Sequence, residues 1–277
     1  MTATLTLPPT SPPPPATGGS PARRRGPGTK AVSALAVLFA VAAVAYGCFC
    51  IIDVMAIRTT RSVQGFAATP SITLDIRDGG IHVSPATDGR ITVTTRVRHT
   101  LRSPSWSVAP VGSTLRFRSR CPATLATTCD VEFDVALPPG TAIVGRAGDG
   151  WLHVTGIGGP VDVTLGDGTS RVSDARGVIR IHSSDGSIHL TDARPTSLNL
   201  RTSDGSIHAT LTTVPPQTDL RTGDGSIELV LPDDGRAVAV DATTGDGSVH
   251  DEVRTDQTAD RVVHAHTGDG SVTVRYP

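Results

Sequence analysis

Hydrophobic and polar residues alternate along most of residues 72–277, on both sides of a recurring Asp-Gly pair. Aligned on each Asp, the positions six and four residues before it form two mostly apolar columns: Val161/Val163, Ile179/Ile181, Leu198/Leu200, Thr218/Leu220, Val240/Ala242 and Val263/Ala265. The positions three and five residues after it form two more: Leu152/Val154, Ser170/Val172, Ile188/Leu190, Ile207/Ala209, Ile227/Leu229, Val249/Asp251 and Val272/Val274. Because strand side chains alternate between two faces, each repeat is predicted to contain two short strands with one inward face each.

The repeat has a period close to twenty residues. The seven Asp residues follow one another at steps of 18, 18, 19, 20, 22 and 23 residues, and the segment "ITLDIRDGGIHV" around Asp78 has the same register. The longer steps come from insertions between one repeat and the next, which we expect to be outer loops. A β-solenoid has these properties, because each coil cannot close its own core and stacks on the next coil. The fold class predicted for residues 71–277 is therefore all-β, a β-solenoid resembling a parallel β-helix.

An antiparallel arrangement of stacked hairpins is the alternative. Asp-Gly is a strong signal for a two-residue hairpin turn, and the inward positions would be the same in that pairing. Like residues in like positions favour stacked coils, since a meander has no reason to keep such columns.

A long apolar segment precedes the repeats. Residues 31–52 contain no charged residue, and a helix of this length reaches roughly 33 Å, enough to cross a bilayer. We therefore predict a transmembrane helix over 30–52. Basic residues lie before it and Asp53 follows it, so the N-terminus is expected in the cytoplasm and the C-terminal domain outside the cell. A cleaved signal peptide and a lipoprotein processing box ending at Cys48 are the alternatives.

Three further segments complete the predicted organisation. Residues 1–29 are rich in Pro, Gly, Ser and Thr, and are expected to form a disordered cytoplasmic tail. Residues 53–70 are expected to form a short polar stalk. The exported part is divided into residues 71–140 and the regular coils of 141–277. Cys121 and Cys129 lie in the former, where an oxidising exterior favours a disulfide between them.

Composition narrows the possible functions. Aromatic residues make up only 3% of the 277 residues, which predicts a narrow core filled by aliphatic side chains. The whole chain has a formal net charge of −1, but its first 52 residues hold four basic residues and no acidic one. The remainder is mildly acidic and lacks the basic stripe that nucleic-acid binding needs.

Part of the chain resembles a known family. The segment "VEFDVALPPGTAIVGRAGDG" at 131–150 and the turns "TSDGSI" and "TGDGSV" are similar to those of the bacterial putative-adhesin β-repeat proteins, a cell-surface family of unknown function. The resemblance extends over about residues 70–277. It implies an adhesin-like β-solenoid at the cell envelope and supplies no catalytic motif.

The column of carboxylates is the feature with most chemical interest. Neighbouring charges about 4.8 Å apart repel by roughly 0.9 kcal/mol even in bulk water, so some interaction is expected to offset this repulsion. One explanation is an Asx turn, in which each Asp accepts a hydrogen bond from a backbone amide two residues further on. The other is a row of calcium ions, although each coil supplies only one recurring acid and no firm metal site follows. The column consists of Asp149, Asp167, Asp185, Asp204, Asp224, Asp246 and Asp269.

Histidine recurs four residues after the Asp. It occupies this outward position at His153, His189, His208 and His250, with Arg171 and Glu228 in the intervening repeats. Two neighbouring histidines could share a transition metal or form a pH-sensitive pair. The simpler interpretation is a solvated strand face.

Catalysis is not expected. Polysaccharide-cleaving β-helices pair carboxylates in a groove beside aromatic side chains, whereas this part of the chain has only Trp106 and Trp151 and spreads its acids along turns. No cofactor is predicted. The leading hypothesis is a non-catalytic, membrane-anchored surface module that binds a cell-wall or envelope component. The alternatives are a sensor or accessory subunit of an envelope-stress system and a calcium-binding repeat protein.

Overall fold

The computed structural model describes residues 28–55, 57–100, 102–122 and 129–277. The chain divides into two compact units, Met1–Phe49 and Cys50–Pro277. Of the predicted tail, residues 1–27 lie outside the described part. Residues Gly28–Met55 form helix α1, which includes the whole segment predicted to cross a membrane. Among the described residues, we find no helix with the length and hydropathy that a membrane crossing requires.

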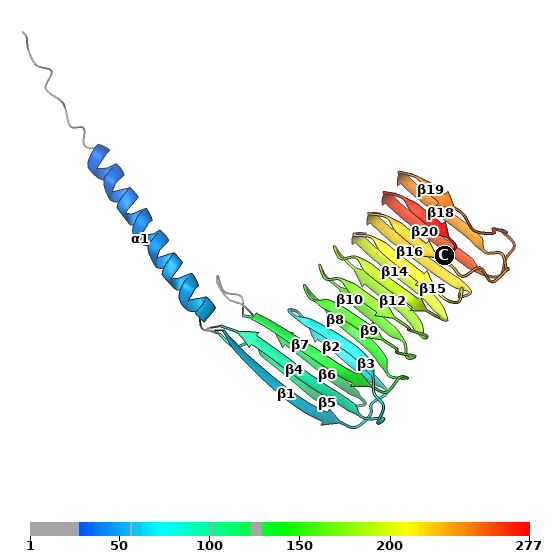
Figure 1. The fold of residues 1–277 in the computed structure, drawn as a ribbon, viewed down its shortest axis with the longest axis horizontal. Coiled ribbons are helices and arrows are strands. Elements are labelled where there is room, and N and C mark those ends of the chain that lie inside the picture. The colour runs from blue at the N-terminus through cyan, green and yellow to red at the C-terminus, as the bar shows by residue number, and fades with distance from the viewer. Residues whose placement is uncertain (1–27, 56, 101, 123–128) are drawn as a thin grey trace, which may run out of the picture. The chain divides into compact units, whose positions relative to one another are not determined.

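The second unit consists of two β-sheets (Figure 1). Their strands are given below in spatial order. The first sheet, sheet A, contains β1 (Arg58–Phe66), β4 (Ile91–His99), β7 (Cys129–Leu137), β3 (Gly80–Pro85), β9 (Trp151–Thr155), β11 (Ser170–Ser173), β13 (Ile188–Ala193), β15 (Ile207–Leu211), β17 (Ile227–Val230), β21 (Val272–Arg275) and β19 (Val249–Asp251). The second, sheet B, contains β18 (Ala239–Asp246), β20 (Val262–Asp269), β16 (Gln217–Asp224), β14 (Ser197–Asp204), β12 (Val178–Ser183), β10 (Val161–Leu165), β8 (Ala142–Ala147), β2 (Ser71–Ile76), β6 (Thr114–Arg120) and β5 (Ser105–Val111).

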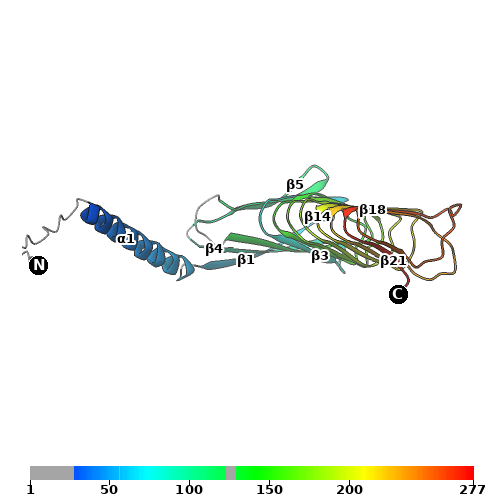
Figure 2. The same cartoon turned by 90° about the horizontal axis from the view of Figure 1, so that it is seen from above.

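Each repeat contributes one strand to each sheet, and the repeats pair in parallel. Val161 lies opposite Ile179 in sheet B, and Ile188 lies opposite Ile207 in sheet A. The parallel pairing confirms stacked coils for the repeats and excludes the hairpin alternative there. Seen from above, the strands of the two sheets curve around a common interior (Figure 2).

Aliphatic side chains from both sheets fill that interior. The apolar columns predicted from the sequence are buried throughout the central coils, including Leu152, Ile181, Leu198 and Ile227, each at most 1% exposed. Every buried hydrophobic residue that the structure describes lies between Ile72 and Val274. The unit Cys50–Pro277 thus contains its own core, so we expect it to fold without the rest of the chain.

The last two coils do not stack in chain order, contrary to the expectation that consecutive coils lie next to one another. Strand β20 pairs with β16 on one side and with β18 on the other, and β21 lies in the same way between β17 and β19. Figure 1 shows red β20 between yellow β16 and orange β18. The coil that ends the stack has a weaker core, because Val249 is 40% exposed and Asp251 occupies an inward column. Burying the coil with Val272 and Val274 in its place, both 0% exposed, removes more apolar surface from water.

The other end of the stack is also out of chain order. The coil of β2 and β3 pairs directly with β8 and β9, so the early copy around Asp78 stacks on the coil of Asp149 as its register predicts. The coil of β6 and β7 lies on its other side. Antiparallel strands continue both sheets beyond it, β4 and β1 in sheet A and β5 in sheet B. The prediction of a stalk over 53–70 is wrong for residues 58–66, which pair with β4 along their whole length as β1.

Candidate ligand-binding site

The Asp-Gly pairs form one ridge along the stack. Asp204 lies opposite Asp224, Asp224 opposite Asp269, and Asp269 opposite Asp246. Backbone hydrogen bonds join the corners of neighbouring coils, such as the Gly225 amide to the Asp269 carbonyl at 2.9 Å. All seven Asp residues of the column are exposed. Their carboxylates therefore repel one another through water, where the repulsion is weak.

The side-chain hydrogen bonds between neighbouring corners come from hydroxyl groups and not from the Asp carboxylates. Within the described residues, no hydrogen bond reaches any of the seven carboxylates, so the Asx-turn explanation is wrong for this column. Instead, a buried Thr two residues before the Asp donates to the corner of the next coil: Thr222 Oγ1 to the Gly205 carbonyl at 2.7 Å and Thr267 Oγ1 to the Gly225 carbonyl at 2.7 Å. Sequence reasoning missed these residues, although Ser or Thr at this position recurs in five coils: Ser183, Thr202, Thr222, Thr244 and Thr267.

The glycine of each pair is required by the close approach of the coils. A Cβ atom on Gly168 would overlap the carbonyl oxygen of Gly150, and one on Gly186 would overlap that of Gly168. The backbone φ of these two residues is not in the left-handed region, so spacing between coils, and not turn geometry, excludes a side chain there.

The ridge does not form a metal site of ordinary composition. No group of three or more His, Cys, Asp or Glu side chains among the described residues is arranged to hold a metal ion. One carboxylate per coil, exposed and separated from the next by a full strand spacing, falls short of the six to eight oxygen ligands that calcium takes.

The recurring histidines lie together on the outer face of sheet A. His82, His153, Arg171, His189 and His208 are successive cross-strand neighbours on β3, β9, β11, β13 and β15, and we call these five residues the histidine–arginine row. The rings of His189 and His208 are stacked, with centroids 5.2 Å apart and planes 4° from parallel. His82 was not part of the predicted set, although it is four residues after Asp78 and so has the same position in the repeat. His250 lies apart from the row, because Glu228 and Thr273 come between.

Carboxylates occur at the two ends of the row and not within it. Asp134 on β7 lies 3.8 Å from His82 Nδ1, and Glu228 on β17 lies 3.2 Å from His208 Nδ1. Hydrogen bonds from Arg275 and His208 lower the pKa of Glu228, so this carboxylate is charged at neutral pH. The middle of the row has Arg171 as its permanent charge.

A groove of about 450 Å³ follows the middle of the row. One side is formed by His82, His153, Arg171 and His189, and the other by hydroxyl-bearing residues of the same strands: Thr155, Ser173 and Thr191. The last three residues are called the hydroxyl row below. Their side chains recur two positions after the histidine–arginine row, as outward positions on one strand do.

The two histidines beside Arg171 are held in their neutral form. Burial is the main cause that lowers the pKa of His153 and of His189, and the charge of Arg171 lowers both further. The Nε2 atom of His153 is buried and has no hydrogen-bond partner among the described residues. Near neutral pH the groove therefore has one fixed positive charge between two imidazoles that become cationic on acidification.

The outer face of sheet B has a different electrostatic arrangement. Arg201 and Arg221 are cross-strand neighbours there, as the residues of the histidine–arginine row are in sheet A. Both pair with one carboxylate, that of Asp219, at 3.4 Å and 2.9 Å. These two arginines thus share one carboxylate of the protein.

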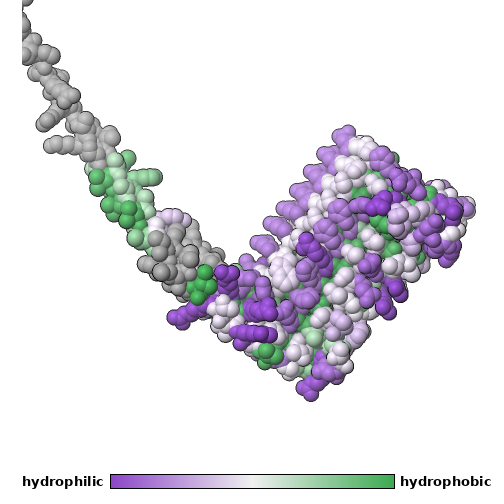
Figure 3. Space-filling model, in the orientation of Figure 1, coloured by the Kyte–Doolittle hydropathy of each residue, from purple (hydrophilic) through white to green (hydrophobic). Residues whose placement is uncertain are grey.

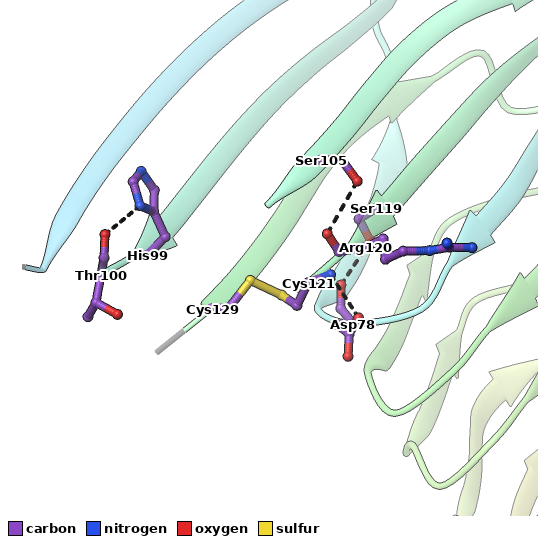
Figure 4. Close-up of a disulfide and its surroundings, with 8 residues drawn as sticks. All are labelled: Asp78, His99, Thr100, Ser105, Ser119, Arg120, Cys121 and Cys129. Carbon is purple, nitrogen blue, oxygen red and sulfur yellow. Dashed lines mark hydrogen bonds between the residues drawn. A yellow bond between two sulfur atoms is a disulfide. The ribbon is translucent and has the colours of Figure 1, made fainter. Parts of the chain in front are cut away.

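The predicted disulfide is present near the other end of the stack. Cys121 and Cys129 are bonded and join the end of β6 to the start of β7 (Figure 4). The Cys121 amide donates to Asp78 Oδ2 at 2.9 Å, and Ser119 Oγ donates to the Asp78 carbonyl at 2.8 Å. Asp78 thus fixes the chain just before the bridge. The residues between the two cysteines, 123–128, lie outside the described part of the chain.

Comparisons with known proteins find a family match within the repeat region. Residues 146–275 match the Toastrack DUF4097 family. Among curated proteins, no sequence is significantly similar to the chain. This match lies within the segment, about residues 70–277, whose sequence resembles the bacterial putative-adhesin β-repeat proteins.

Three solved structures of low sequence identity are similar to the chain. A putative adhesin from Parabacteroides distasonis ATCC 8503 is 15% identical, with a TM-score of 0.45 over 78% of this chain and 97% of that one. A putative adhesin from Bacteroides fragilis NCTC 9343 is 14% identical, with a TM-score of 0.39 over 79% and 97%. A putative cell adhesion protein from Clostridium sporogenes ATCC 15579 is 11% identical, with a TM-score of 0.36 over 79% and 100%.

Proposed function

With a Toastrack match over residues 146–275 as the premise, we propose that this chain is a non-catalytic, membrane-anchored envelope protein. Its β-solenoid would lie on the extracellular side and serve as an adhesive or structural surface for a cell-wall or envelope component. The in-register stacking of the coils carries this proposal, since it repeats each outward side chain as a row along the sheet. Rows of this kind suit a partner that is itself extended and repetitive.

The sequence of α1 supports the anchor. Residues 31–52 contain no charged residue, and the described apolar side chains of this helix are exposed, with Leu35 at 72% and Phe39 at 79%. In Figure 3 the described atoms of α1 are mostly green, while purple and white cover most of the visible face of the strand-bearing unit. A lipid bilayer is the environment in which an uncharged helix with such side chains is stable. The basic residues before residue 31 favour a cytoplasmic N-terminus.

The disulfide supports an extracellular position for the strands. Disulfides persist in oxidising compartments and are rare in the cytosol of most organisms. The bond between Cys121 and Cys129 lies in the part of the chain that follows α1.

Binding to the cell envelope tests the adhesive role. A soluble fragment of residues 53–277 should cosediment with purified cell-wall or membrane fractions from the source cells. The Cys121→Ser/Cys129→Ser fragment, which lacks the disulfide, serves as the matched control for non-specific adsorption of a destabilised domain. Failure of the folded fragment to bind any envelope fraction would contradict the proposal.

Deletion of the tail separates this role from signalling. A chain lacking residues 1–22 retains the basic residues before α1 and the whole β-solenoid. We expect it to support the same attachment or envelope phenotype as the full chain. Loss of the phenotype, with the protein still at the cell surface, would favour the sensor alternative.

A further inference from the structure

On the outer face of sheet A, the basic side chains in the middle of the histidine–arginine row lack carboxylate partners. The histidine–arginine row crosses five neighbouring strands, which at about 4.8 Å per strand gives a track of roughly 19 Å. Its end residues, His82 and His208, each lie beside a carboxylate of the protein. Between them, no carboxylate of the described residues forms an ion pair with Arg171.

This lack of an acidic partner distinguishes Arg171 from Arg201 and Arg221 of sheet B. Arg201 and Arg221 share Asp219, whereas the cross-strand neighbours of Arg171 are His153 and His189. An exposed guanidinium with five free donors matches a carboxylate of a ligand in a bidentate geometry.

The second side of the groove supplies hydroxyl groups at the same strand spacing. Ser173 Oγ donates to Thr155 Oγ1 at 3.1 Å, and Thr191 continues this hydroxyl row on the next strand. Hydroxyls both donate and accept, so they complement the hydroxyl groups of a sugar as well as they complement an anion. Two acids, Asp174 and Asp192, come directly after Ser173 and Thr191 in the chain, and Asp174 is paired with Arg176 at 3.4 Å.

An aromatic side chain, that of Trp151, lies beside the histidine–arginine row. The ring of Trp151 is 5.2 Å from the ring of His153, and the indole packs over Gly80, where a Cβ atom would overlap it. Trp151 is half-buried, so one part of its surface is available to a ligand. An indole combines an apolar face with a polar edge, which suits the apolar face of a pyranose ring.

From these observations we propose that the groove between the histidine–arginine row and the hydroxyl row binds an acidic polysaccharide. The uronate carboxylates lie along Arg171 and the neighbouring histidines, and the sugar hydroxyls contact Thr155, Ser173 and Thr191. A sugar ring beside His153 contacts Trp151. The inference rests on the proposed adhesive role and names the chemical class of its ligand.

Binding is coupled to protonation. A carboxylate over the row stabilises the cationic form of His153, which faces His82 and Arg171, and of His189, which faces Arg171 and His208. The other charged groups at the row are Asp134 and Arg96 at one end and Glu228 and Arg275 at the other, and they pair among themselves and with the end histidines. Since uronate carboxylates stay ionised at pH 5.5, the complex takes up protons as the pH falls and binding becomes tighter.

Calorimetric titration with defined polygalacturonate oligomers tests the proposal on residues 53–277. We expect binding at pH 5.5 that weakens at pH 7.5. Arg171→Gln should weaken binding at pH 5.5 by about tenfold or more, as loss of a hydrogen bond to a charged group predicts. Arg221→Gln on sheet B is the matched control and should bind like the parent. His153→Gln/His189→Gln should remove most of the pH dependence, with thermal melting used to verify that each variant is folded.

Several outcomes would overturn the inference. These are no binding of the oligomers at pH 5.5, equal loss in the Arg171→Gln and Arg221→Gln variants, equal binding of neutral dextran, or binding of inorganic polyphosphate without binding of polygalacturonate. The envelope cosedimentation assay separates the two proposals. If Arg171→Gln cosediments normally and the parent does not bind polygalacturonate, the ligand is wrong while the adhesive role stands. If the parent binds polygalacturonate but no envelope fraction, the adhesive role is wrong while the groove is a polysaccharide site.

Discussion

The central coils and the coil that ends the stack have the same repeat pattern but meet different physical demands. The coil of β16 and β17 has a neighbouring coil on both sides, and its inward residues Leu220 and Ile227 are at most 1% exposed. The coil of β18 and β19 has one neighbour, and its inward positions hold the exposed Val249 and Asp251. A central coil thus needs glycine at its corner and buried side chains at its inward positions. The end coil tolerates a polar residue at an inward position and covers the coil beneath it.

The largest expected effect comes from disturbing a central corner. Gly168→Ala places a Cβ atom against the carbonyl oxygen of Gly150, so neighbouring coils must separate locally or the corner must distort. We expect the free energy of unfolding in urea to fall by about 3–5 kcal/mol, in the range of severe packing strain. Gly140→Ala is the control, since a Cβ there meets no atom within 4 Å and should change stability by less than about 0.5 kcal/mol. Similar stability of the two variants would show that the coils are not held at this spacing.

The next effect concerns the ion pair that joins the segments preceding the last two coils. Arg261 is 4% exposed and pairs with Asp234, joining the loop before β18 to the residue before β20. Arg261→Ala leaves the Asp234 carboxylate without its partner, and we expect a loss of about 2–4 kcal/mol in urea unfolding, somewhat less than for a fully buried pair. Arg236→Ala in the same loop breaks an exposed pair with Asp260 and should cost less than about 1 kcal/mol. A smaller loss for Arg261→Ala than for Arg236→Ala would contradict this account.

A matched pair of valines compares the two kinds of coil directly. Val272 and Val249 are cross-strand neighbours at the same repeat position, yet the former is 0% and the latter 40% exposed. Val272→Ala should lower the free energy of unfolding by about 2 kcal/mol, because it leaves a cavity in the core. Val249→Ala should lower it by less than about 1 kcal/mol, since the end coil has no neighbour on its outer side. Equal losses would indicate that β18 and β19 are covered in solution, for instance by a second copy of the chain.

The smallest effect is a pH dependence confined to the central coils. The folded-state pKa values of His153 and His189 lie below the ordinary value of 6.5, so the unfolded chain binds more protons in the window between 6.5 and the lower folded values. The free energy of unfolding should therefore decrease as the pH falls through that window. The His153→Gln/His189→Gln variant should lose less stability than the parent on acidification from pH 7.5 to 5. His250→Gln in the end coil should behave like the parent, and the reverse result would argue against the burial of the central histidines.

Much of the solenoid follows from the periodicity of the sequence. Alternation around Asp-Gly identifies the inward columns, and the burial of Ile188, Leu198 and Ile227 agrees with it. The pattern also places the Asp residues on one ridge. It does not determine which coil neighbours which, because all coils present nearly the same edge. Asp251 in an inward column was the available signal that its coil ends the stack, since a carboxylate there would otherwise be buried without a partner.

The candidate site was harder to predict. The outward histidines could be aligned from the repeat, but the groove depends on which residues share it from the neighbouring outward row. Thr155, Ser173 and Thr191 are ordinary strand residues in the sequence, and only parallel pairing in register brings them into one row. The sequence also did not indicate the role of Thr222 and Thr267 at the corners. Their hydroxyls donate to the neighbouring coil, so this role depends on how the coils stack.

The exchanged order of the last two coils has a consequence for biosynthesis. During translation, residues 239–251 emerge before residues 262–275, so the strands of the earlier segment cannot reach their final partners when they are made. Until then, the edges of β16 and β17 stay open or accept β18 and β19 as temporary neighbours, which must leave again when the later segment arrives. Completion of the stack therefore waits for residues 262–275, and until they are made the growing edge of the chain lacks its final neighbour.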